Sequence, residues 1–580
     1  MGEEGGGRSC GTPRDLQKLK QQAMEYYREN DVPRRLEELL NSTFYLQPAD
    51  LYGHLANYFS KLAKPPSICR VVGKIVLDGL GLPTLQVEIS CIIQNFPKFM
   101  CSVVMPAHFE VLENALPELV DAEEAERDLA VSRAMEWANE AMTEELWGLL
   151  PANQAEVDRR LRLFFDNKVQ EDKERKELER SLEEPVHVPL PVTPPPPLPP
   201  TKKKGPKPGR RDTLCERPIL PSEPPEPILY GSMAVGAVSL AVAKTSARLA
   251  SIPLYLNIAL LKHNQVSDCH SPPLPAIYEL LLEIQKQVNR AMEMPPPPKS
   301  ESKKGHDGSK RGQQPITGKM SHLGCLTINY DTIEQPLTLI QGICSNLGLE
   351  LGMSLHLAIN CAGHEVMDYS KGKYEVMVGT YKNTAEMVDL YVDLVNKYPS
   401  IIALIDPFRK EDSEQWDSIY NALASRCYII AGAASKSISK LLEHRNISTP
   451  KSHGLVIKYT NQTTVSDLVE ITHLIDGKKH LAVLGSTEAE TSDDSLVDLA
   501  VGLGARFIKL GGLSRGERVT KYNRLLTIEE EVIHNGTWGC SEEHNFSYFQ
   551  EGATATMPEE VPGPLDSIFP TEVVEESTKI

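Results

Sequence analysis

The sequence predicts an α/β protein whose C-terminal half folds as a barrel, and two observations carry this prediction. First, short apolar runs recur along that half: LHLAI (355–359), IIALI (401–405), YIIA (428–431), LVIK (455–458), LAVL (481–484) and FIKL (507–510). Second, helical stretches separate the runs, which is the pattern of parallel strands covered on both faces. Six evenly spaced strand–helix units, with room for more upstream, favour a barrel over an open sheet.

Length and composition limit the class of protein. The 580 residues allow two to four domains. The net charge of −18 argues against a general nucleic-acid or anionic-membrane binder, because both need clustered positive charge. The 11 cysteines are scattered without a CxxC pair, which is typical of a reducing compartment. The chain starts without a secretory signal, and its most apolar run (233–243) is too short to span a bilayer. We expect a soluble cytoplasmic protein that binds neither nucleic acid nor membrane.

The N-terminal region predicts a small helical unit after a Gly-rich, disordered tail. This unit covers residues 16–64, and the stretch from Val32 to Pro66 holds two amphipathic patterns. Asn41, Ser42 and Thr43 are expected to end the first helix. The apolar residues of the second pattern are Leu51, Leu55, Phe59 and Leu62. Two short helices cannot bury this much apolar surface alone, so we expect a partner, most simply a second copy.

This segment resembles the dimerisation and docking domain of the type II regulatory subunit of cyclic-AMP-dependent protein kinase. The shared features are Pro33, the Leu39-Leu40 pair, QPADL (47–51) and YFSKL (58–62). The resemblance implies a four-helix dimer whose groove accepts the amphipathic helix of an anchoring protein. It also implies placement in a cilium or sperm flagellum. The alternative is an ordinary helical hairpin packed on the next domain.

Two lysines stand out in the predicted barrel, where function is expected at the carboxyl ends of the strands. Lys458 ends LVIK, and Lys509 lies within FIKL. A lysine in a buried strand is costly, so both ammonium groups are expected to point into the barrel mouth. Each would lower the pKa of the other, and a partly neutral lysine can take a proton next to a carboxylate while the other holds an anion. The alternative is that one or both reach solvent.

Longer strings of the chain resemble the enolase family. They are LDGLGLPTLQVEIS (77–90), YGSMAVGAVSLAVAKTSARLASIPLY (230–255), LAINCAGHEVMDYSKGKY (357–374), ALIDPFRKEDSEQW (403–416) and the stretch from Val501 to Val532. The match is to the divergent vertebrate paralogue with an N-terminal docking-type extension. It implies an α+β N-terminal domain followed by an eight-stranded α/β barrel. It also implies a dimer, either of two copies or with another enolase, and reversible dehydration of 2-phosphoglycerate to phosphoenolpyruvate in glycolysis with Mg²⁺ as the cofactor.

The resemblance assigns the predicted site position by position. Lys458 matches the family's proton acceptor, and Lys509 matches its substrate-binding lysine. The three metal-binding carboxylates fall at Asn360, Ile405 and Ala433, of which only Asn360 offers a side-chain oxygen. The neighbouring Asp406 belongs to the family's Asp-Pro-Phe turn and is expected to face the wrong side of the strand.

Other family positions have changed as well. The catalytic glutamate falls at Leu323, beside His322, and the mobile-loop serine falls near Glu110. The phosphate-binding string becomes Gly485, Ser486, Thr487 and Glu488. A metal site could be re-formed by Glu488, Glu490 or Asp493, whose alternative is to be solvated loop acids.

The predicted divisions follow from these patterns. They are a disordered tail (1–15), a docking-like segment (16–64), the first part of an enolase-like N-terminal domain (66–184), a Pro-rich basic insertion (185–228), the last part of that domain (229–262), the start of the barrel (263–293), a disordered insertion (294–319), the barrel (320–535) and an acidic tail (536–580). Two functions remain open from sequence: an enolase-type lyase, or a catalytically impaired enolase-like scaffold that dimerises and docks to anchoring proteins. A third is a barrel that binds a phosphorylated metabolite without turnover.

Overall fold

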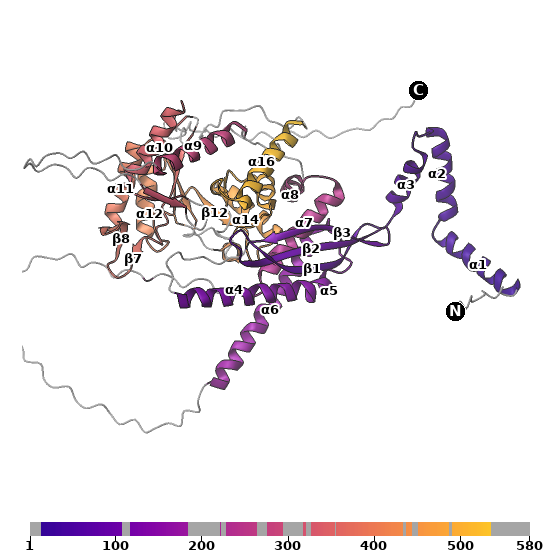
Figure 1. Ribbon diagram of the computed structural model, residues 1–580. Helices are drawn as coiled ribbons and strands as arrows, with labels where there is room; N and C mark the ends of the chain where they lie inside the picture. Colours follow the sequence, from indigo (N-terminus) through magenta and orange to yellow (C-terminus); the bar gives the residue numbers. More distant parts are fainter. Residues whose placement is uncertain are drawn as a thin grey trace, which may run out of the picture.

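The computed structural model shows three helices at the N-terminus, a mixed α/β domain and a curled parallel sheet (Figure 1). The described residues are 13–106, 117–183, 221, 228–263, 275–293, 317–320, 326–353, 355–432, 437–443, 450–485 and 490–534. Most of the predicted tails and insertions lie outside these ranges.

The N-terminal helices are α1 (Pro13–Glu29), α2 (Val32–Leu46) and α3 (Leu51–Leu62). The prediction that Asn41–Thr43 ends the first helix is wrong. The hydroxyls of Ser42 and Thr43 instead donate to the Leu39 carbonyl inside the helix, at 2.9 and 2.8 Å. The helix ends at Leu46, and Gln47 caps it in the left-handed conformation. Asp50 then caps α3 by accepting from the Gly53 N–H.

The next unit is a three-stranded antiparallel sheet covered by helices. Its strands are β1 (Ser67–Leu77), β2 (Pro83–Ile93) and β3 (Phe96–Met105), in the order β1-β2-β3. The helices of this unit are α4 (Pro117–Asn139), α5 (Ala141–Leu146), α6 (Gln154–Glu183), α7 (Met233–Ala250) and α8 (Leu254–His263). Alternate residues of β2, such as Val87 and Ile89, are fully buried. The second half of α6 is exposed and runs away from the sheet (Figure 1).

The six apolar runs form one parallel sheet, as predicted. In the order β14-β13-β12-β11-β10-β6 its strands are Phe507–Lys509, Leu481–Gly485, Gly454–Lys458, Tyr428–Ala431, Ile401–Ile405 and Leu357–Asn360. A separate antiparallel pair, β4 (Thr317–Met320) and β5 (Leu326–Asn329), precedes the six strands along the chain. Within the described part of the chain, no pairing joins the β4–β5 hairpin to the six strands, nor β6 to β14.

Helices alternate with these strands along the chain. They are α9 (Pro275–Glu293), α10 (Glu334–Asn346), α11 (Thr384–Lys397), α12 (Ser413–Leu423), α13 (Ile438–Glu443), α14 (Val465–Gly477), α15 (Ser495–Gly502) and α16 (Gly516–His534). A small antiparallel sheet of β7 (Met367–Asp368), β8 (Lys373–Met377) and β9 (Thr380–Lys382) follows β6.

The two faces of the parallel sheet carry different apolar clusters. On the inner face, Ile430, Val456, Val483 and Phe507 belong to one cluster that is separate from the main core. Their neighbours along the strands, such as Ile429, Ile457 and Leu484, belong to the main core beneath the helices. Because side chains alternate along a strand, this division identifies the inward-facing residues of each strand.

Helix α7 has the length and composition to cross a membrane, and it is the one such helix in the described ranges. However, 72% of its apolar window is buried within the protein, and a core helix meets the same criteria.

Candidate active site

The predicted lysine pair lies at the carboxyl ends of neighbouring strands. Lys458 is the last residue of β12, and Lys509 is the last residue of β14. Both are paired in register with Gly485 of β13, which lies between them. They follow the inner-face residues Val456 and Phe507 by two positions, so both side chains leave the sheet on its inner side. With strands about 4.8 Å apart, the two Cα atoms lie roughly 10 Å from each other.

Gly485 leaves space between the two lysines. A Cβ atom built at this position would lie 3.1 Å from Val456 Cγ1 and 3.7 Å from the Cβ of Lys509. Any larger residue would therefore crowd Val456 and the base of the Lys509 side chain. Lys458 and Lys509 are both exposed, which matches the alternative that the sequence left open, in which these side chains reach solvent. Two cationic groups on one concave inner face favour the binding of a small anion.

The family's metal positions lack carboxylates. Asn360 is exposed at the end of edge strand β6 and can offer one neutral oxygen, whereas Ile405, its register partner on β10, offers none. The adjacent Asp406 is buried and has a positive φ of 49°. Its Oδ1 accepts a hydrogen bond of 2.8 Å from the Gly432 N–H, so this carboxylate fastens the ends of β10 and β11 together.

Glu490 lies in an ion-pair cluster with α16. Its Oε2 atom is 2.9 Å from Lys521 Nζ, and its Oε1 atom is 3.6 Å from Arg518 Nε. The side chains of all three residues are buried. The Glu490 carbonyl also accepts from the Gly79 N–H at the β1–β2 turn, at 2.8 Å. Two cations already neutralise this carboxylate, so it does not offer a free ligand for a metal.

Asp493 joins the barrel to the N-terminal sheet. Its Oδ2 accepts from the Val104 N–H of β3 at 3.1 Å, and its Oδ1 accepts from the Ser495 N–H at the start of α15 at 2.9 Å. Lys244 of α7 lies 3.8 Å away. These contacts give Asp493 a structural role between the two domains.

The described residues do not fit the family's magnesium site. Mg²⁺ prefers carboxylate oxygens in near-octahedral geometry. Here one amide stands at Asn360, while the carboxylates of Asp406, Glu490 and Asp493 are bonded elsewhere. No group of three metal-ligating side chains occurs among the residues that the structure describes. The other predicted positions lie outside those residues: Glu110, His322, Leu323, Ala433, Ser486, Thr487 and Glu488.

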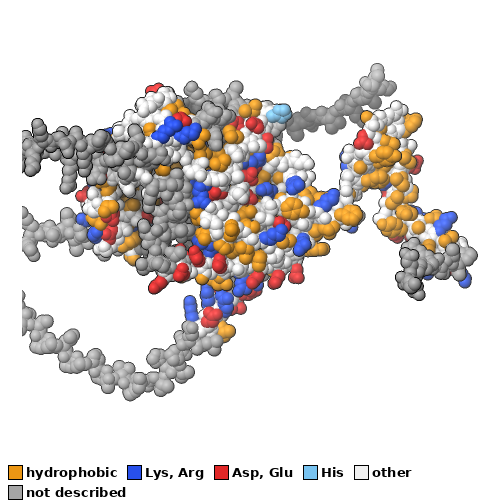
Figure 2. All heavy atoms as spheres, viewed as in Figure 1, with side chains coloured by type: hydrophobic (Ala, Val, Ile, Leu, Met, Phe, Trp, Pro, Cys, Tyr) orange, Lys and Arg blue, Asp and Glu red, His pale blue; other side chains and the backbone are white. Residues whose placement is uncertain are grey.

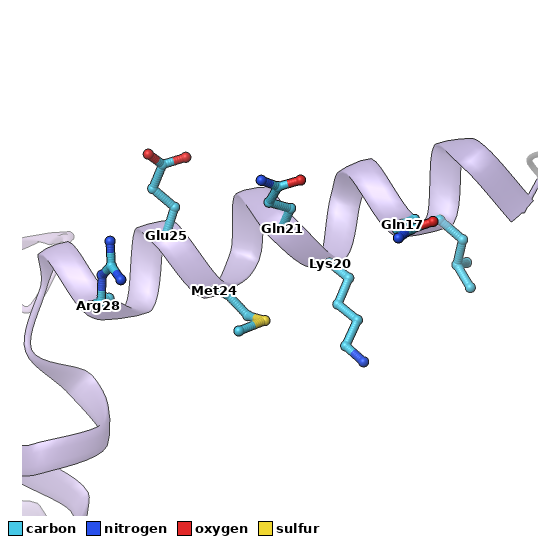
Figure 3. A pocket seen from close by; sticks show the side chains of 7 residues that line it. Gln17, Lys20, Gln21, Met24, Glu25 and Arg28 are labelled. Atoms are coloured by element: carbon cyan, nitrogen blue, oxygen red, sulfur yellow. The ribbon is translucent and has the colours of Figure 1, made fainter.

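Two further hollows lie away from the lysines. One runs along α1 and is lined only by that helix, with Lys20 and Met24 on one side and Gln21 and Glu25 on the other (Figure 3). It is an open flank of a helix rather than an enclosed site. The other, about 430 Å³, lies between α6, α8 and α14 and is lined by residues such as Leu261, Val469 and His473. Neither contains a residue of the predicted site.

The curled parallel sheet, with helices that alternate with its strands, defines this chain as an α/β-barrel protein. A family model described as the enolase C-terminal TIM barrel domain matches residues 306–546. The chain is 73% identical to mouse enolase 4 over the whole of both chains, and 70% identical to human enolase 4 over 100% of this chain and 99% of that one. Its identity to enolase 4 of Xenopus laevis is 45%, covering 94% of this chain and 98% of that one. The chain therefore belongs to the enolase family and is similar to its enolase 4 paralogues.

The sequence did not reveal which residues surround Lys458. The place of Gly485 between the two lysines follows only from the register of the strands. One signal could have indicated this place: Gly485 ends the apolar run LAVLG, which lies in the sequence between the runs that carry the two lysines.

Proposed function

We propose that the barrel mouth catalyses the reversible dehydration of 2-phosphoglycerate to phosphoenolpyruvate. The observation that supports this proposal is the placement of Lys458 and Lys509 on one inner face, on either side of Gly485. Lys458 Nζ takes the proton next to the substrate carboxylate, and the electron pair of that C–H bond forms the enolate. The enolate then expels hydroxide from the neighbouring carbon to give the double bond. The ammonium of Lys509 holds the substrate carboxylate and offsets its growing charge.

The cofactor that the family implies for this proposal is Mg²⁺, although the described residues do not fit its site. A bound magnesium ion would supply Lewis-acid stabilisation of the carboxylate. Because the described positions offer one neutral oxygen at Asn360, we expect a weak requirement for the metal or a slow reaction.

The test is phosphoenolpyruvate formation by the purified full chain, with Mg²⁺ and with EDTA. Lys458→Met should lower kcat by about 10² to 10⁴, the usual contribution of a general base. Lys509→Met should raise KM and lower kcat. Lys397→Met is the matched control, because Lys397 lies exposed on α11 in an ion pair with Glu334. Equal rates for wild type and Lys458→Met would refute the proposal.

A second function is favoured by the apolar surface of α1–α3: an enolase-like scaffold that dimerises and docks to anchoring proteins. Among the described residues of these helices, Leu39 is the one that is buried. Phe44, Tyr45 and Tyr52 are 71%, 84% and 79% exposed, and hydrophobic side chains cover α2 and α3 in Figure 2. Exposed patches of this kind mark interaction sites. An amphipathic helix of an anchoring protein fits such a surface.

Deleting residues 16–64 tests the docking function. We expect the deletion to abolish binding of an amphipathic anchoring-helix peptide while the circular dichroism and the melting of the barrel stay unchanged. Phe44→Asp should weaken peptide binding, whereas Glu37→Gln, on the same helix, should not. Retained binding after the deletion would contradict the docking assignment.

Assembly and location follow from the same proposal. We expect a homodimer, or a heterodimer with another enolase, measured by light scattering of the full chain alone and mixed with that enolase. We also expect a cytoplasmic protein concentrated in a cilium or sperm flagellum, measured by imaging a tagged chain. A monomer at all concentrations would count against the first, and a diffuse signal against the second.

A further inference from the structure

We propose that Tyr459 and Asp158 are positioning residues, through which the N-terminal domain fixes the place of Lys458. The segment 459–466 leaves β12 directly after Lys458 and leads into α14. Residues of α6 and α7 bond to this segment at several points along its length. The inference rests on the proposed function, because it concerns the proton acceptor of that reaction.

Tyr459 and Asn461 hold the beginning of the segment. The Tyr459 side chain is buried, and its hydroxyl donates to the Gly236 carbonyl of α7 at 2.5 Å. The Gly236 N–H donates back to the Asn461 carbonyl at 3.0 Å. A Cβ atom at Gly236 would lie 2.5 Å from that carbonyl oxygen, so only glycine permits this close approach. One residue of the N-terminal domain thus bonds the segment at two of its first three positions.

Asp158 of α6 holds the end of the segment. The Asp158 side chain is buried, and its Oδ2 accepts from the Ser466 N–H at 2.9 Å and from the Ser466 hydroxyl at 2.6 Å. Its Oδ1 accepts from the Ser239 hydroxyl at 2.7 Å and from Gln154 Nε2 at 2.9 Å. Ser239 Oγ in turn accepts from the Val465 N–H at 2.9 Å. The first two N–H groups of α14 are therefore satisfied by the other domain.

These contacts define the position of the Lys458 backbone from both sides. Its strand is paired with β13 up to Lys458 itself, and the segment that follows is bonded to α6 and α7. Catalytic groups must be held within about 0.5 Å of their working position. A displacement of about 1 Å can cost a factor of about 10² in rate. Since none of these bonds involves the lysine side chain, Tyr459 and Asp158 act through position alone.

The test compares Tyr459→Phe and Asp158→Asn with Thr472→Val in the full chain. Thr472 is also buried and donates its hydroxyl to the Leu468 carbonyl, but it lies in the middle of α14. We expect the first two variants to lower kcat about tenfold or more, with KM changed less than about twofold, and to shift the pH profile of kcat. Thr472→Val should leave kcat and its pH profile unchanged, even if this variant lowers the melting temperature as much as Tyr459→Phe and Asp158→Asn do.

A second measurement does not depend on turnover. Reductive methylation with ¹³C-formaldehyde labels the lysines for NMR, and the Lys458 resonance is identified by its loss in Lys458→Arg. We expect that resonance to move in Tyr459→Phe and to stay in place in Thr472→Val. If the wild type forms no phosphoenolpyruvate, the proposed function fails, and this resonance alone decides the inference. An unmoved resonance, or unchanged kcat and pH profile in an active enzyme, would overturn it.

Discussion

Replacing Gly236 by alanine tests how tightly the two domains meet. Gly236 is buried near the start of α7. A Cβ atom there would lie 2.5 Å from the Asn461 carbonyl oxygen, 2.9 Å from the Thr463 carbonyl oxygen and 2.9 Å from Met105 Cε. The methionine tip can move aside. The two carbonyl oxygens belong to the backbone that follows Lys458, so that backbone must move by several tenths of an ångström.

The expected cost follows from three effects. Overpacking at a tight site costs about 1–3 kcal/mol. Stretching the hydrogen bond from the Gly236 N–H to the Asn461 carbonyl costs about 1 kcal/mol more. Alanine regains about 1 kcal/mol over glycine inside a helix. We therefore expect Gly236→Ala to lower the free energy of unfolding by about 1–3 kcal/mol.

Gly342→Ala provides the control with the opposite sign. Gly342 lies exposed within α10, and a Cβ atom there would meet nothing within 4 Å. This substitution should stabilise the protein by up to about 1 kcal/mol, through helix propensity alone. Urea unfolding of the full chain, followed by circular dichroism, measures both variants. If Gly236→Ala is as stable as the wild type, the close contact between α7 and the Lys458 segment is not present in solution.

Two further predictions concern pH and buried charge. Burial lowers the pKa of His453, whose Nδ1 accepts from the Ile429 N–H at 3.0 Å, so the folded protein holds this ring neutral. The neutral ring stabilises the folded protein at pH values above the pKa of an unfolded histidine, about 6.5. This stabilisation is lost as the pH falls below that value. His453→Gln should therefore flatten the decline of the melting temperature between about pH 7 and about pH 5, and an equally steep decline would contradict this. Asp498→Ala removes the buried carboxylate that binds the half-buried Arg524 at 2.6 and 2.9 Å, while Glu531 still pairs with that arginine, and should cost about 1–3 kcal/mol. Glu171→Ala, which breaks an exposed pair with Lys168, should change unfolding by less than about 1 kcal/mol in the same denaturation assay; equal losses for the two variants would refute the role of burial.

The strands and the lysine pair could be predicted from sequence because their signals are local. Each strand is a short apolar run between helical stretches, and residues such as Val456 and Ile457 lie on the faces that alternation requires. Lys458 and Lys509 interrupt those runs at their ends, and a charged residue in that position indicates the strand end. The shared inner face of the two lysines then follows from the register with Gly485.

The environment of the loop acids could not be predicted, because their partners lie far away in the sequence. Glu490 pairs with Lys521 of α16, and Asp493 accepts from the backbone of Val104 in the N-terminal sheet. The spacing of these two acids along one loop allowed a metal site. Spacing does not show which groups from distant parts of the sequence bind them in the folded protein. Ser42 and Thr43 illustrate a local failure, since residues that often end helices instead bond back into α2.

The exposed half of α6 gives the protein a built-in spacer. Beyond Phe165 this helix extends for 18 residues, which at 1.5 Å per residue is about 27 Å. Ion pairs along its surface, such as those of Asp172 with Arg175 and Lys176, support a helix that has no core to lie on. The end of α6 therefore stands clear of the sheet that the helix leaves (Figure 1). A fluorophore on Ser181 would report binding at this helix end without touching the core.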